Sequence, residues 1–151
     1  MSTELAISIL ALLVALLSAV YAGRAASEAK HANRISSHDH KVTILDAVRD
    51  FKHTFHTQGE AIDATFVYAL RLAADKASLY FTSAVASHLS QYAKAAFQVQ
   101  IARDSARGFE SAGLDAHAQT KWMEVFALRD RCQELEGSLL TDLEAETKIV
   151  N

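Results

Sequence analysis

The sequence predicts an all-α fold, in which an N-terminal transmembrane helix with a polar stalk precedes an antiparallel four-helix bundle with coiled-coil-like packing. The chain of 151 residues has no proline and five glycines, so long uninterrupted helices are expected. The stretch from Leu5 to Gly23 is uncharged and apolar, and apolar residues recur at helical spacing after it. We therefore expect an anchor over residues 1–23, a stalk over residues 24–36 and a helical bundle over residues 37–151.

The anchor is predicted from its length and its flanks. About 20 apolar residues, at about 1.5 Å each, cross the ~30 Å hydrocarbon core of a bilayer. Tyr21 stands where an aromatic ring favours the headgroup layer, and Arg24, Lys30 and Arg34 are the first cations beyond it. These four residues are the predicted membrane interface.

Two other interpretations of the apolar stretch compete with an anchor. One is a cleaved signal peptide, because small residues surround Tyr21 as they do at cleavage sites. A signal peptide carries a basic segment ahead of its apolar core, however, and here the only charged side chain in that position is Glu4. The other is a buried core helix, which the apolar residues on every face of this helix oppose.

The distribution of charge predicts the orientation. No Lys or Arg precedes the apolar stretch, whereas Arg24, Lys30, Arg34 and Lys41 follow it, and cationic flanks stay in the cytoplasm. Residues 24–57 carry six cations and four anions, while residues 110–151 carry four cations and nine anions. We interpret this gradient as a basic segment near anionic headgroups and an acidic segment repelled from them. Four scattered cations do not form the basic patch that nucleic-acid binding needs.

The first two helices of the bundle follow from start signals and apolar spacing. Ser36 and Asp39 resemble a capping box, which predicts that the stalk ends there and that a new helix runs from about residue 38 to residue 57. Its apolar face comprises Ile44, Leu45, Val48, Phe51 and Phe55. Gly59 predicts a break, followed by a helix over residues 60–76 that presents Ile62, Phe66, Ala69, Leu70 and Ala73.

The third helix, over residues 78–107, has two apolar seams. The first seam comprises Phe81, Val85, Leu89, Tyr92, Ala96 and Val99, and the second comprises Leu79, Ala86, Phe97 and Ile101. We favour a central position in the bundle, with self-association through the second seam as the alternative.

A loop and a long last helix complete the expected fold. Gly108 and Gly113 bracket the loop, and the helix follows over residues 115–147. Its apolar arc comprises Trp122, Val125, Leu128, Cys132, Leu135, Leu139, Leu140 and Leu143.

Histidines supply the candidate metal site. Asp50, His53, His56 and Glu60 share one helix face, and histidines with carboxylates at such spacings form metal sites in helical bundles. His53 and His56 are the predicted ligands. The competing interpretation is that these side chains are solvated, because their face lies opposite the apolar arc and Gly59 separates Glu60 from the helix.

The remaining polar residues do not indicate catalysis. Cys132 lies within the apolar arc of the last helix, where a thiol packs as a small inert hydrophobe. Glu136 lies at the edge of that arc, so it either reaches water or pairs with polar groups of a neighbouring helix. The sequence has no phosphate-binding loop, catalytic triad, CxxC pair or zinc-ligand spacing. We expect neither an enzyme nor a cofactor.

The stalk carries a family resemblance. Residues 24–35 read RAASEAKHANRI and are followed by His38-Asp39-His40-Lys41. Together with the uncharged span, they resemble a broad set of uncharacterised bacterial proteins that have an N-terminal transmembrane helix and a helical cytoplasmic domain. The match covers about the first fifty residues. It implies a bacterial or phage origin and a membrane anchor, and no catalytic residue.

These observations predict a single-pass protein of the bacterial inner (plasma) membrane, with its N-terminus outside and its C-terminal domain in the cytoplasm. The expected function is that of a scaffold or sensory adaptor acting through protein–protein contacts. The expected partners are the lipid bilayer and an unidentified protein, with a second copy of the chain as a further candidate. One alternative is a metal- or ligand-sensing bundle using His53 and His56. Another is a phage spanin-like envelope protein with its domain outside, which the cation count opposes.

Overall fold

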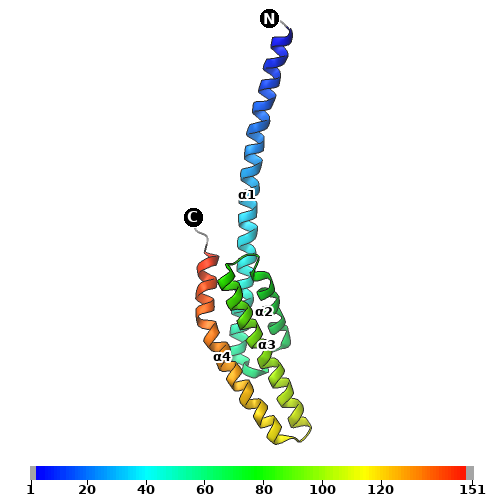
Figure 1. The fold of residues 1–151 in the computed structure, drawn as a ribbon, viewed down its shortest axis with the longest axis vertical. Coiled ribbons are helices and arrows are strands. Elements are labelled where there is room, and N and C mark those ends of the chain that lie inside the picture. Colours follow the sequence, from blue (N-terminus) through cyan, green and yellow to red (C-terminus); the bar gives the residue numbers. More distant parts are fainter. Residues whose placement is uncertain (1–2, 149–151) are drawn as a thin grey trace. The chain divides into compact units, whose positions relative to one another are not determined.

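The computed structural model describes residues 3–148, without the side chains of Glu4, Leu5, Ala6 and Glu60. Among the described residues, every regular element is helical. These elements are α1 (Thr3–Gln58), η1 (a 3-10 turn, Gly59–Ala61), α2 (Ala64–Ala77), α3 (Ser83–Ser111) and α4 (Asp115–Thr147) (Figure 1). The predicted all-α class is confirmed.

Helix α1 is continuous over 56 residues, so the predicted break at Ser36 is wrong. No proline or glycine interrupts the chain between Gly23 and Gly59, and nothing else there removes a helical hydrogen bond. The hydroxyl of Thr43 donates to the carbonyl of Asp39 at 2.9 Å, a contact typical of a helix interior. Contacts nevertheless divide the chain into two compact units, Met1–Ser37 and His38–Asn151.

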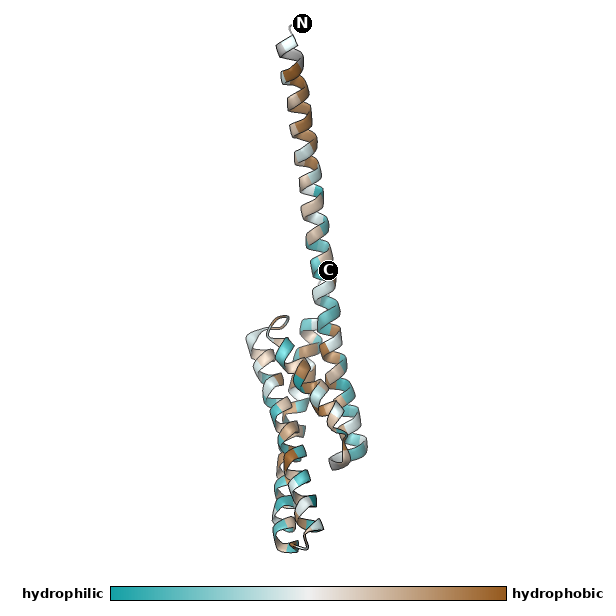
Figure 2. Ribbon diagram, turned by 90° about the vertical axis from the view of Figure 1, so that its right-hand side faces the viewer, coloured by the Kyte–Doolittle hydropathy of each residue, from teal (hydrophilic) through white to brown (hydrophobic). Residues whose placement is uncertain are grey.

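The described part of the first unit is helical and largely exposed, and its first part is apolar. It has a window of mean hydropathy 2.0, and none of that window is buried. Figure 2 shows the apolar colouring along this first part of α1. By length and composition it is long and apolar enough to cross a membrane. The absence of burial does not fit a core helix.

The second unit has one hydrophobic core, to which α1, α2, α3 and α4 all contribute. The predicted apolar face of residues 38–57 is confirmed, since Ile44, Leu45, Val48, Phe51 and Phe55 are all buried. The first seam of the third predicted helix is also buried, from Phe81 to Val99. Helix α4 has the predicted bounds, and Val125, Cys132, Leu139 and Leu143 of its arc are fully buried.

The connection between α1 and α2 is longer than predicted. Gly59 has a φ of +57°, a left-handed conformation that glycine adopts without strain, and it is the first residue of the 3-10 turn. Helix α2 therefore starts at Ala64 rather than at residue 60. Asp63 caps it by accepting a hydrogen bond from the Thr65 backbone amide at 2.7 Å. Ala69, predicted to be in the core, is exposed.

The second seam predicted for residues 78–107 is only partly a packing surface. Leu79 lies in the turn before α3 and is 73% exposed, and Ile101 is 51% exposed. Ala86 is buried, and the Arg71 guanidinium lies 4.5 Å from the ring centroid of Phe97. This seam is therefore covered in part by α2 and otherwise faces outward.

Helices α3 and α4 form a hairpin with a short connection. Helix α3 continues through Gly108 to Ser111, so the predicted loop shrinks to residues 112–114, where Gly113 turns the chain with a φ of +70°. Both views show the two helices side by side and extending past the connection between α1 and α2 (Figures 1 and 2).

Candidate functional site

The candidate site is an open hollow between α1 and α4. It has a volume of about 360 Å³ and is lined by Arg49, Lys52, His53, His56 and Glu136. Four of these residues lie within two turns of α1. Their side chains line the same hollow because residues three and four apart share a helix face. Glu136 comes from α4, 80 residues after His56.

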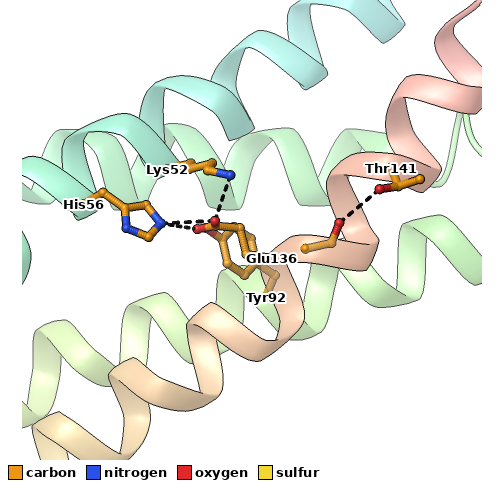
Figure 3. Close-up of polar contacts among 6 residues, drawn as sticks. Lys52, His56, Tyr92, Glu136 and Thr141 are labelled. Carbon is orange, nitrogen blue, oxygen red and sulfur yellow. Dashed lines mark hydrogen bonds and ion pairs between the residues drawn. The ribbon is translucent and has the colours of Figure 1, made fainter.

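Glu136 is the centre of the polar cluster, and its side chain is 8% exposed. The Nε2 atom of His56 lies 3.1 Å from each of its carboxylate oxygens. The Lys52 ammonium lies 3.0 Å from Oε1, and the Tyr92 hydroxyl donates to Oε2 at 3.3 Å. Figure 3 shows these three side chains converging on the carboxylate from α1 and α3. A buried carboxylate is costly without such partners, so the cluster satisfies Glu136.

The buried surroundings of Glu136 disfavour ionisation of the neighbouring Tyr92 hydroxyl and Cys132 thiol. Burial raises the pKa of the Tyr92 hydroxyl far above its usual value, and the nearby Cys132 and Glu136 add to that effect. Burial raises the pKa of the Cys132 thiol to about 12, with a further contribution from Glu136. Both groups are therefore neutral at physiological pH, and the thiol is a poor nucleophile.

A row of contacts joins basic side chains of α1 to α4. Arg49 binds Glu144 at 2.7 Å, Lys52 and His56 bind Glu136, and the Lys41 ammonium donates to the backbone carbonyl of Glu146 at 2.9 Å. The basic groups of α1 thus find partners on the acidic α4 inside the domain. The charges of Arg49 and Lys52 are paired inside the domain, and the predicted attraction of the basic segment to headgroups stays a prediction.

The predicted metal ligands lie on the same hollow but differ in their contacts. Both side chains are exposed, and His56 also contacts the Glu136 carboxylate. The Glu60 side chain lies outside the described residues. Among the residues that the structure describes, no group of three or more His, Cys, Asp or Glu side chains is arranged to hold a metal ion. The metal site therefore stays a prediction.

Some members of the cluster around Glu136 are predicted from the sequence and others are not. Glu136 was expected to reach water or pair with a neighbouring helix, and it pairs. Lys52 and Tyr92 were not singled out. Tyr92 matched the core seam, and nothing in the spacing indicated that its hydroxyl reaches a carboxylate of α4.

The predicted interface residues lie on the first unit. Tyr21, Arg24, Lys30 and Arg34 are all exposed on α1, next to the apolar stretch. Their contact with headgroups remains a prediction. Comparison of the chain with family models, with curated proteins and with solved structures gives no match.

Proposed function

We propose that this chain is a single-pass membrane protein whose helical domain serves as a scaffold or sensory adaptor through protein contacts. The observation that carries the proposal is the continuity of α1, which supplies both an exposed apolar stretch and five residues of the domain core. No loop or linker separates the two parts of this helix.

The domain itself is proposed to be an antiparallel four-helix bundle with coiled-coil-like packing. The shared core of α1, α2, α3 and α4 and the short connections between them support this architecture. A non-catalytic function is proposed because the polar groups of the hollow neutralise each other and the one thiol is buried.

The proposed location is a bacterial inner membrane, with the domain in the cytoplasm. The support is the set of cations that follow the apolar stretch and the lack of cations before it. The test is a pair of C-terminal fusions to the full chain, one to alkaline phosphatase and one to green fluorescent protein. Fluorescence without phosphatase activity is the expected result. Phosphatase activity without fluorescence would reverse the orientation and favour an envelope protein with its domain outside.

A second candidate function is metal or ligand sensing at the hollow. One observation favours it, since His53, His56 and Glu136 come from two helices and line the same space. The Lys52 ammonium, 3.0 Å from Glu136, competes with a metal ion for that carboxylate. Equilibrium dialysis of the full chain against Zn²⁺ tests the candidate. Binding that His56→Ala abolishes and that the matched variant His117→Ala retains would support it, and equal binding by both variants would remove it.

A further inference from the structure

A second hollow lies on the other side of α1, between α1 and α2. It has a volume of about 500 Å³ and is lined by Asp46, Ala47 and Asp50 of α1 and by Phe66 and Ala69 of α2, among others. Ala47 and Phe66 are partly buried and pack against the core, so they form an apolar floor. We call this hollow the α1–α2 groove.

The charge of the groove is negative and largely unpaired. Asp50 is exposed, and among the described residues its carboxylate has no hydrogen bond or ion pair. Asp46 contacts Arg49 at 3.9 Å, but Arg49 makes its shorter contact, at 2.7 Å, with Glu144. Asp46 and Asp50 are one helical turn apart, so their carboxylates lie on the same face of α1. In the hollow around Glu136, by contrast, the charges already pair with each other.

Large apolar side chains extend the surface of the groove along α2. Tyr68 is 63% exposed and Leu72 is 56% exposed. Leu72 follows Ala69 by three residues, and Tyr68 follows Thr65, another residue of the groove, by three residues. Residues at this spacing share a helix face, so Tyr68 and Leu72 flank the groove. Exposed apolar surface rimmed by polar residues is typical of protein-binding sites.

We propose that the α1–α2 groove binds a helix of a partner protein, which places a lysine or arginine between Asp46 and Asp50 and small apolar residues against Phe66. The inference rests on the proposed function and specifies the partner's chemistry. A groove between two helices accepts the side-chain ridge of a third helix. The aliphatic stem of a lysine or arginine covers the apolar floor while its charged end reaches the carboxylates. An anionic membrane surface does not fit this groove, because the two carboxylates repel it.

The test uses the full chain in nanodiscs of neutral phosphatidylcholine and a fluorescent helical peptide of roughly 20 residues, long enough to form a helix. The probe peptide is alanine- and leucine-based, with lysines at i, i+4 spacing, and the control peptide has glutamates at those positions. Binding is measured by fluorescence anisotropy, with empty nanodiscs subtracted. We expect saturable binding of the lysine peptide and none of the glutamate peptide.

Two variants and a matched control locate the binding. The double variant Asp46→Asn/Asp50→Asn should weaken binding about fivefold or more, because it removes two partly exposed ion pairs. Leu72→Ser should weaken it about tenfold by removing apolar contact area, with little effect on folding since Leu72 is exposed. Asp130→Asn on α4, which also removes an exposed carboxylate, should leave binding unchanged.

Three results would overturn the inference. The first is equal binding of both peptides, and the second is unchanged binding of the lysine peptide by the double variant. The third is self-association of the chain without peptide that Asp46→Asn/Asp50→Asn abolishes, which would show that a second copy covers the groove. Failure of the proposed function looks different, because the chain would then leave the membrane fraction. A chain that stays in membranes without binding the lysine peptide contradicts only this inference.

Discussion

His56 Nε2 lies 3.1 Å from both carboxylate oxygens of Glu136, and this contact joins α1 to α4 across 80 residues of sequence. With Lys52 on the same carboxylate, it fixes how the second half of α1 lies along α4. A buried polar group of this kind favours one arrangement of helices, because any shift along the helix axis leaves the carboxylate unpaired.

Replacing Glu136 with alanine should lower the free energy of unfolding by about 2 kcal/mol, because the buried Tyr92 hydroxyl loses its acceptor and a cavity opens. Lys52 and His56 are 42% and 44% exposed, so water solvates them in the variant and limits the loss. Denaturant titration of the detergent-solubilised full chain measures the change. Glu134→Ala, at an exposed position of the same helix, should stay within about 0.5 kcal/mol of the wild type. Equal effects of the two variants would contradict a role for the cluster.

Acid should weaken the contact between Arg49 and Glu144. The hydrogen bond from Arg49 holds the pKa of Glu144 below its ordinary value of 4.5. A lowered carboxyl pKa stabilises the fold above pH 4.5, and that contribution is lost as pH falls through the lower folded value. Carboxyl ¹³C titration of the wild type and of Arg49→Met measures it. The variant should titrate closer to pH 4.5, and an unchanged midpoint would show that Arg49 does not act on this carboxylate.

Cys132 should resist alkylation in the folded chain. Burial raises its pKa from 9.0 to about 12, so the thiolate population at pH 8 falls about a thousandfold. The reaction of iodoacetamide with the native and the denatured chain, followed by mass spectrometry, checks this. Ser138→Cys, exposed on the same helix, is the matched reactive control in a Cys132→Ala background. Comparable native rates at the two positions would contradict the burial of Cys132.

Arg103 should stabilise the connection between α1 and α2. Its Nη1 donates to the buried carbonyl of Ile62 at 2.8 Å. Arg103→Met keeps most of the volume but removes the donor, so the free energy of unfolding should fall by about 1–3 kcal/mol. The exposed Arg107→Met is the control, with an expected change below about 0.5 kcal/mol in the same denaturant titration. A loss of stability in Arg107→Met alone, or no loss in either variant, would contradict the observed contact.

Helical periodicity was sufficient to predict the core faces of α1 and α4 and the first seam of α3, but not the exposure of Ala69, Leu79 and Ile101. Ile44, Val48, Phe51 and Phe55 are buried as the spacing indicates, and α4 has its predicted bounds. The break at Ser36 was wrong because serine side chains tolerate a helix interior when nothing else ends the helix.

The polar cluster was harder to predict because it depends on contacts far apart in sequence. The spacing shows that His53 and His56 share a face of α1, but not which helix that face meets. Glu136 could therefore be placed at the edge of an apolar arc without its partner being known. Likewise, the exposed Ala69 and the groove beside it depend on the starting position of α2, which Gly59 and Asp63 set together.

Membrane anchoring by α1 is tested most directly by alkaline carbonate extraction of membranes that contain the full chain with its native N-terminus, followed by intact mass spectrometry. The chain is expected to stay in the membrane pellet with its N-terminal segment intact. Leu13→Arg/Leu17→Arg, which puts two charges into the exposed apolar part of α1, should be extracted. Release of the unaltered chain by carbonate, or a shortened form that begins near Gly23, would contradict a membrane anchor formed by α1.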